Sequence, residues 1–181
     1  MAKEKSKAEL LKEQLFMEKK HAGLIMSELE IAACDDFCES YKNFLDRSKT
    51  EREAAKTAIA LAEKEGFKEY KAGMSLKAGD KIYYCNRSKA VILAVIGSEP
   101  LDKGVHLAAA HIDSPRLDLK QNPLYEDNDI ALFKTHYYGG IKKYQWTAMP
   151  LALHGVAVKK DGTKVELRIG EEENDPVLSL I

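Results

Sequence analysis

The sequence predicts an α/β protein with a helical first part and a β-rich C-terminal part. The first observation is an apolar run, Val105–Ala110, which only His106 interrupts. A run without polar alternation predicts a short strand covered on both faces, as in the centre of an α/β sheet. The second is a helix capping box, in which Thr50 is followed three residues later by Glu53. The third is Asp161-Gly162, a hairpin signal between two β-forming runs.

Two helices are expected before the capping box. Apolar residues recur at helical spacing over Lys7–Leu29, where Gly23 is expected to bend or split the helix. A second apolar stripe begins at Cys34 and predicts a helix that ends near Arg47. Both stripes predict faces that pack against a core or a partner. Cys34 and Cys38 lie one helical turn apart and are interpreted as small buried side chains rather than metal ligands.

The capping box begins a third helix, and Gly66 is well placed to end it. Two strands are predicted next, at Lys81–Cys85 and Ala90–Ile96, and Asn86-Arg87-Ser88 joins them as a hairpin. The third helix is expected to bury one apolar face, made of Ala54, Ala58, Ile59, Leu61 and Ala62.

Beyond Pro123 the β-forming residues dominate. Leu124–Asp129 is interpreted as an acidic turn, and Ile130–Tyr138 as β-rich. Leu151–Lys160 and Thr163–Ile169 predict a hairpin with one apolar and one charged face. Closing it on a two-residue turn predicts three pairs on the apolar face: Val158 with Val165, Val156 with Leu167, and His154 with Ile169. On that face a packed histidine is favoured over a metal ligand.

The composition restricts the class of protein. The 181 residues carry a net charge of -1, so nothing indicates the basic surface of a protein that binds nucleic acid or anionic membranes. No apolar run approaches the length of a membrane span. The three cysteines form no Cys-x-x-Cys pair, which favours a reducing, cytoplasmic setting over a disulfide framework.

The residues with the clearest chemical potential follow the apolar run. His111 and Asp113 are two positions apart, so in an extended chain their side chains point to the same side. A neutral imidazole is a good zinc ligand, and a carboxylate on its other ring nitrogen fixes its tautomer and orientation. The alternative is a hydrogen-bonded histidine at a strand end, with Asp113 capping a turn. The spacing leaves both interpretations open, because one histidine makes no metal site.

A resemblance favours the first interpretation. His111-Ile112-Asp113-Ser114-Pro115-Arg116-Leu117, then Tyr138-Gly139-Gly140-Ile141 and Trp146, resemble the aspartyl aminopeptidase family of dizinc aminopeptidases, which includes the vacuolar aminopeptidase I type. The resemblance covers roughly Tyr41 to the end of the chain. It implies that His111 is a zinc ligand and that Asp113 is the carboxylate that orients it. It also implies two Zn²⁺ ions per complete site, whose further ligands this chain lacks.

The resemblance also implies a domain organisation and a function. Residues 1–119 are expected to be the front part of the dizinc-peptidase α/β domain, and residues 120–181 the start of an inserted antiparallel β domain. We expect metal-dependent removal of N-terminal residues from peptide substrates, a homo-oligomer formed through the β region, and no activity in this N-terminal portion alone. The alternative from another class is a non-catalytic oligomerisation or interaction module.

Overall fold

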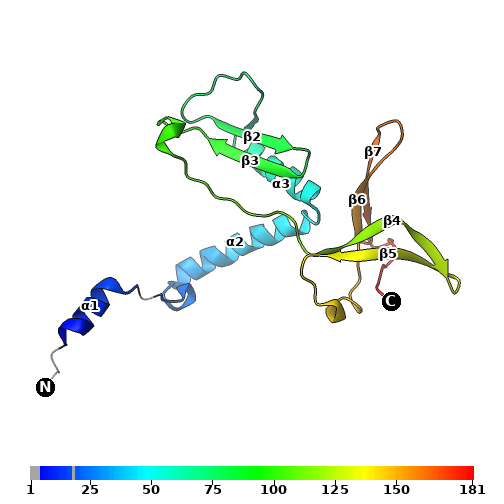
Figure 1. Cartoon of the computed structure of the whole chain (residues 1–181), viewed down its shortest axis with the longest axis horizontal. Helices are drawn as coiled ribbons and strands as arrows, with labels where there is room; N and C mark the ends of the chain where they lie inside the picture. The colour runs from blue at the N-terminus through cyan, green and yellow to red at the C-terminus, as the bar shows by residue number, and fades with distance from the viewer. Residues whose placement is uncertain (1–4, 18) are drawn as a thin grey trace. The chain divides into compact units, whose positions relative to one another are not determined.

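The computed structural model describes residues 5–17 and 19–181 and confirms the α/β class (Figure 1). Helices occupy the first part of the chain and β-ribbons the last part. The chain divides into two compact units, Met1–Asn43 and Phe44–Ile181, which are considered separately below. Three short 3-10 turns lie outside the regular elements, at Ala22–Leu24, Leu101–Lys103 and Lys143–Gln145.

The first unit is helical, but the helix predicted over Lys7–Leu29 ends at Leu15, so the prediction that it is split is confirmed and its length is wrong. Helix α1 spans Lys7–Leu15 and begins with a capping box at Ser6, and α2 spans Glu28–Asp46, crossing into the second unit. Gly23 lies in the 3-10 turn between them. Gly23 accepts this break at little cost, because glycine has a poor helix propensity.

The predicted burial of these two helices is wrong. Neither α1 nor α2 buries a residue among those described, and Cys34 and Cys38 are exposed. The apolar stripes are real, but a stripe only indicates which face a helix can bury. Burial also needs a second apolar surface opposite that face, and helical spacing carries no information about one.

The second unit is built on α3, which spans Glu51–Lys64. Both halves of the predicted capping box form: the hydroxyl of Thr50 accepts from the N–H of Glu53, and the Glu53 carboxylate accepts from the N–H of Thr50. Gly66 ends the helix at φ +84°, a left-handed conformation that suits glycine. The helix buries Ala54, Ala55 and Ala62. Leu61, which was predicted to be buried, is 49% exposed, because it lies beside the buried face rather than on it.

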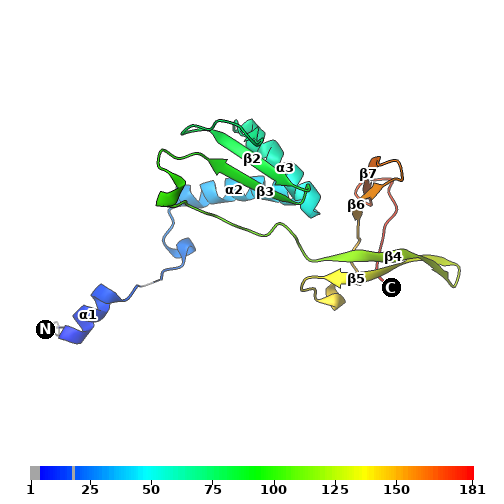
Figure 2. The same ribbon diagram turned by 45° about the horizontal axis from the view of Figure 1, so that its top comes forward.

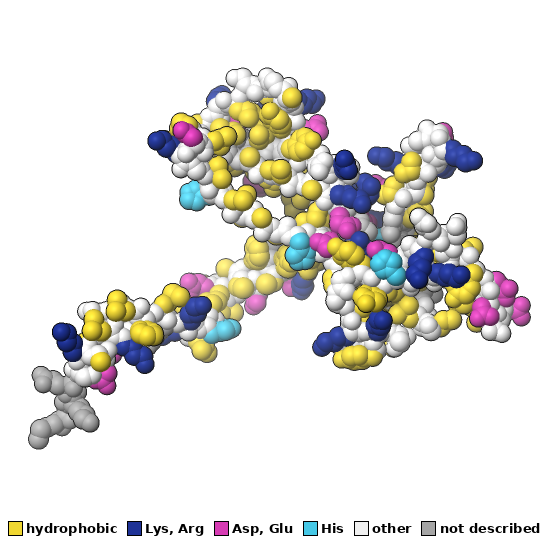
Figure 3. All heavy atoms as spheres, viewed as in Figure 1, with side chains coloured by type: hydrophobic (Ala, Val, Ile, Leu, Met, Phe, Trp, Pro, Cys, Tyr) yellow, Lys and Arg dark blue, Asp and Glu magenta, His cyan; other side chains and the backbone are white. Residues whose placement is uncertain are grey.

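Helix α3 packs against a three-stranded sheet. Strand β1 (Lys68–Glu69) runs parallel to β2 (Lys81–Asn86), which pairs antiparallel with β3 (Ala90–Val95). The predicted hairpin is confirmed, and its two turn residues, Arg87 and Ser88, both have positive φ. That geometry is the type I′ turn, whose twist matches the twist of the paired strands. Figure 3 shows hydrophobic side chains gathered over β2 and β3.

The predicted strand Val105–Ala110 is wrong. Residues 104–115 form no strand, and Val105 and Leu107 are 67% and 84% exposed. His111 and Asp113 therefore follow an irregular segment and not the carboxyl end of a central strand. An apolar run indicates side chains that favour burial, but a strand also needs a neighbouring backbone for its hydrogen bonds. Within residues 5–17 and 19–181, none pairs with this segment.

A long two-stranded ribbon follows (Figure 2). Strand β4 spans Arg116–Asp127 and pairs antiparallel with β5, Ile130–Tyr138, whose bounds match the β-rich prediction. The register shifts between Leu119 and Leu124, where Pro123 cannot donate a ladder hydrogen bond. The interpretation of Leu124–Asp129 as a turn is wrong for its first four residues, which continue β4.

A second hairpin pairs β6 (Leu153–Val158) with β7 (Lys164–Ile169), but the predicted register is wrong by one residue. The loop is longer than the Asp161-Gly162 turn, since Gly162 donates to the carbonyl of Lys159 and takes φ +85°. One extra loop residue moves each side chain to a new partner. The observed pairs include Val158 with Lys164, Val156 with Glu166, and His154 with Arg168.

The capping box of α3 predicts a local contribution to stability. Thr50→Ala is expected to lower the free energy of unfolding of the second unit by about 1 kcal/mol, because an N-terminal N–H loses its acceptor. Urea denaturation followed by Trp146 fluorescence measures it. Ser6→Ala, which removes the matching cap of α1 in the other unit, is the control. An equal shift of the Trp146 transition by both substitutions would contradict the assignment.

Candidate metal centre

The structure brings His111 and Asp113 together at the end of the irregular segment. The Nδ1 atom of His111 lies 2.8 Å from the backbone oxygen of Asp113 and 3.2 Å from its Oδ1. The imidazole is 82% exposed and the carboxylate 34% exposed. Two acceptors at Nδ1 favour the neutral tautomer with a proton on that nitrogen, which leaves the Nε2 lone pair free. Nε2 is therefore the atom of His111 that can bind a metal.

The Asp113 carboxylate is held on its other side by Tyr138. The Tyr138 hydroxyl donates to Oδ2 of Asp113 at 2.6 Å. This hydrogen bond holds the pKa of the Asp113 carboxyl below its ordinary value, and the nearby His111 acts in the same direction. The same bond raises the pKa of the Tyr138 hydroxyl. Asp113 therefore stays ionised near neutral pH, as an orienting carboxylate must.

Arg116 connects this group to helix α3. Its guanidinium carbon lies 4.2 Å from the centroid of the Tyr138 ring, and its Nη1 lies 2.9 Å from the carboxylate of Glu51. Asp118 pairs with Nε of the same guanidinium at 2.7 Å. The cation is thus shared between an aromatic face and two carboxylates. Sequence reasoning assigns no role to Glu51, because no sequence pattern links a first-turn glutamate to an arginine 65 positions later.

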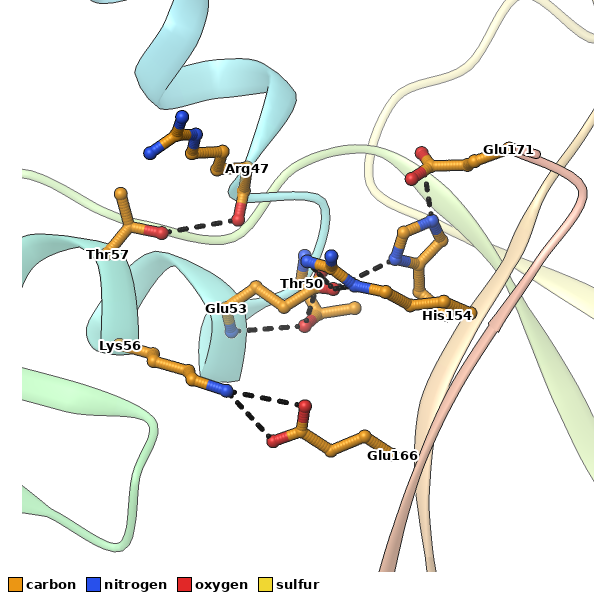
Figure 4. Close-up of polar contacts among 9 residues, drawn as sticks. Arg47, Thr50, Glu53, Lys56, Thr57, His154, Glu166 and Glu171 are labelled. Carbon is orange, nitrogen blue, oxygen red and sulfur yellow. Dashed lines mark hydrogen bonds and ion pairs between the residues drawn. The ribbon is translucent and has the colours of Figure 1, made fainter.

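A second polar cluster lies beside the start of α3 (Figure 4). His154 projects from β6 and is only 7% exposed. Its Nδ1 lies 2.9 Å from Oε1 of Glu53, and its Nε2 lies 3.1 Å from Oε1 of Glu171, the latter an ion pair without hydrogen-bond alignment. Arg168 donates to the same Glu53 oxygen at 3.1 Å.

The prediction for His154 is therefore wrong about its face. The one-residue register shift places it opposite Arg168, on the charged side of the hairpin. Between two carboxylates, His154 joins the hairpin to α3. Glu171, which follows β7, takes part in the same cluster.

An open cavity of about 750 Å³ lies between α3, the start of β4 and the β6–β7 hairpin. Its lining includes Glu51, Glu53, Arg116 and His154, but neither His111 nor Asp113. The His111–Asp113 pair is therefore separate from this cavity. Glu51 and Arg116 link the two, since both line the cavity, Arg116 lies over the Tyr138 ring, and Glu51 pairs with Arg116.

The metal-binding capacity of the described residues is limited. No group of three or more His, Cys, Asp or Glu among them could hold a metal ion. His111 fits zinc as one ligand, because its Nε2 is free and its Nδ1 is held, but structural and catalytic zinc sites use three or four protein ligands.

In the same described ranges, no helix is both long and apolar enough to cross a membrane.

A histidine held in this way by an aspartate is typical of metal-dependent hydrolases. Comparison with known proteins identifies the family to which the chain belongs. Residues 44–180 match the model of the Aminopeptidase I zinc metalloprotease (M18) family. The chain belongs to this family, as the resemblance of its two motifs predicts.

Curated relatives and solved structures agree. A probable M18 family aminopeptidase 1 of Clostridium acetobutylicum is 56% identical over 146 residues, covering 78% of this chain and 31% of that relative. The crystal structure of aminopeptidase I from Borrelia burgdorferi matches with a TM-score of 0.82 at 44% identity, covering 88% of this chain and 40% of that one. The S. cerevisiae mApe1 dodecamer shares the fold at a TM-score of 0.65 and 18% identity. The chain spans about a third of the length of the curated relatives it matches.

The charged cluster predicts a pH dependence of stability. Burial raises the pKa of Glu53, but the contacts with His154, Arg168 and Thr50 lower it by more, so the net shift is downward. A lowered folded-state pKa gives stability that is present above the ordinary glutamate pKa and lost as the pH falls through the folded-state value. Glu53→Gln is expected to lower stability at pH 7 and to flatten its decline in acid.

Urea denaturation of the wild type and the variant from pH 7 to pH 3 measures this difference. Glu173→Gln is the matched control, because Glu173 is exposed and the described contacts give its carboxylate no partner. Parallel curves for the wild type and Glu53→Gln would show that the cluster makes no pH-dependent contribution.

Proposed function

We propose that this chain supplies a zinc ligand, His111, and its orienting carboxylate, Asp113, to an aminopeptidase that removes N-terminal residues from peptides. The observation that carries the proposal is the pair of contacts at Nδ1 of His111, at 2.8 and 3.2 Å. They hold the imidazole by one nitrogen and leave the other for a metal. Membership of a zinc metalloprotease family supports zinc as that metal.

The roles of the chain's own residues follow from their contacts. Zinc in such a site polarises the scissile carbonyl and lowers the pKa of a bound water. Asp113 accepts from Nδ1 of His111 and makes the imidazole a better donor to the metal. By the resemblance, a complete site has two zinc ions, and its other ligands come from outside the described residues.

We also propose the division into residues 1–119, the front part of the peptidase domain, and residues 120–181, the start of an inserted β domain. The proposed boundary falls within β4, at the irregularity between Leu119 and Leu124. The three free cysteines support a reducing, cytoplasmic setting. Unpaired edges of the two β-ribbons support a homo-oligomer formed through the β region.

A second candidate function is a non-catalytic oligomerisation or interaction module. The observation that favours it is the number of exposed apolar side chains, which include Leu107, Leu124 and Ile92. The two candidates differ in what they require of His111. An enzyme needs its free Nε2, whereas an interaction module does not.

The enzyme proposal predicts that activity requires more than these 181 residues. The isolated chain is expected to show no zinc-dependent turnover of aminoacyl-arylamides, acidic or neutral, because one ligand does not make a catalytic site. Expressed with any coding sequence that follows Ile181 in frame, the enzyme is expected to be active and sensitive to chelators. There His111→Ala is expected to lower kcat/KM by about 100-fold or more, as loss of a metal ligand should.

His136→Ala is the matched control. Nδ1 of His136 also contacts a backbone oxygen, that of Tyr137 at 2.7 Å, but the described contacts give it no carboxylate. It is expected to change kcat/KM little. Turnover by the isolated chain that a chelator and His111→Ala both abolish would show that the site is complete without further ligands.

The oligomer proposal predicts self-association through the β region. Sedimentation equilibrium of the chain is expected to show a dimer or larger species. Leu124→Lys, at an exposed position paired with Phe133 on the ribbon, is expected to weaken association on the order of 10-fold, because a charge on a flat edge opposes pairing. Leu107→Lys, exposed but outside residues 120–181, is the control. A monomer at all concentrations would rule out this role of the β region.

A further inference from the structure

Two segments that are distant in sequence contact each other beside His111. One is the stretch from His111 to Arg116, and the other is Tyr138-Gly139-Gly140 at the end of β5. Gly139 has φ +75°, and a Cβ built on it would lie 3.4 Å from Cα of Pro115. A larger residue would be strained at this positive φ, although its Cβ would meet Pro115 at ordinary van der Waals distance, so the backbone conformation is what favours glycine here. The approach places the Tyr138 hydroxyl 2.6 Å from Oδ2 of Asp113.

The segment that carries Asp113 has little other support. Residues 105–115 form no helix or strand, and among the described residues their backbone forms no hydrogen bond with another backbone group. The carboxylate torsion of an aspartate is broad, so an exposed carboxylate turns readily. In this place Tyr138 donates to Oδ2 of the carboxylate, and Nδ1 of His111 lies 3.2 Å from Oδ1.

We propose that Tyr138 is a positioning residue for the metal ligand, acting through Asp113. By donating to Oδ2, its hydroxyl turns Oδ1 toward Nδ1 of His111, 3.2 Å away. The imidazole then keeps its proton on Nδ1 and presents a bare Nε2. Arg116 supports the tyrosine ring from its face, 4.2 Å from the centroid, and is tied in turn to Glu51 of α3.

The last step, binding of zinc at Nε2, rests on the proposed function, but the positioning does not. Without the Tyr138 hydroxyl, the Asp113 carboxylate is free to rotate, and Nδ1 of His111 keeps only the backbone oxygen of Asp113 as an acceptor. The tautomer with its proton on Nε2 then gains population, and that form has no lone pair for a metal on that atom. A residue that strengthens the preference for one tautomer therefore lies on the β-ribbon, 27 positions from His111.

The experiment compares Tyr138→Phe with Tyr137→Phe in the full 181-residue chain. Tyr137 is exposed, and its hydroxyl has no hydrogen-bond partner among the described residues. Long-range ¹H–¹⁵N spectra of histidine-labelled protein, recorded well above the ordinary histidine pKa, report which ring nitrogen is protonated. His111→Ala assigns the signals. In Tyr138→Phe the ratio of the Nδ1–H to the Nε2–H form is expected to fall about 2- to 10-fold, the effect of one hydrogen bond. In Tyr137→Phe it is expected to stay unchanged.

An unchanged ratio in folded Tyr138→Phe would overturn the proposal. If that variant loses its fold, as judged by Trp146 fluorescence, Asp113→Asn provides the test at a loop position. Its neutral amide oxygen is a weaker acceptor, so the ratio is expected to fall, and an unchanged ratio is again decisive against positioning.

Zinc added to the same samples separates the two proposals. If the tautomer ratio of His111 depends on Tyr138 but zinc does not change the Nε2 signal, the positioning role is supported and the proposed function is contradicted. If zinc changes the Nε2 signal of His111 equally in the wild type and in Tyr138→Phe, the proposed function is supported and the positioning role of Tyr138 is contradicted.

Discussion

The first turn of α3 is the constraint on which the second unit depends. Glu53 uses both oxygens of its carboxylate there. Oε2 accepts from the backbone N–H of Thr50 at 3.1 Å, and Oε1 accepts from His154 and Arg168 at 2.9 and 3.1 Å. In the same turn, Glu51 pairs with the first residue of β4. Acidic side chains also suit this end of a helix dipole. One turn therefore starts the helix and holds both β-ribbons.

Local features of the fold could be predicted because their causes are local. The cap at Thr50 and the turn at Arg87-Ser88 each depend on residues within a few positions. The predictions that are wrong concern features that depend on a distant part of the chain, or on whether a loop is one residue longer. Val105–Ala110 has the composition of a buried strand, but the sequence cannot say which backbone would pair with it. The predicted β6–β7 register is wrong because the loop contains one extra residue, Lys160. That residue changes which β7 side chains share a face with a given set of β6 side chains.

The candidate site, too, could be predicted only where its cause is local. His111 and Asp113 could be identified because their spacing has a chemical meaning within three residues. The sequence also contains the Tyr-Gly-Gly motif, but it carries no sign that the hydroxyl of Tyr138 reaches Asp113 across 25 positions. That contact depends on the pairing of β4 with β5, which brings Arg116 opposite Tyr138. The sequence predicted His111 and Asp113 as site residues but assigned no such role to Tyr138, and the ladder between the strands explains why they meet.

The energetics of the His111–Asp113 pair favour a role in binding over a role in folding. The imidazole is 82% exposed, so its hydrogen bond competes with water and contributes little to folding. Holding an exposed side chain in one rotamer costs roughly as much in conformational entropy. The pair is therefore nearly neutral for stability, unlike His154, which is 7% exposed and joins two elements. An arrangement that does little for the fold and leaves Nε2 exposed agrees with the proposed role of His111 as a zinc ligand better than with a packing role. That distinction between two histidines of one chain favours the enzyme over the interaction module.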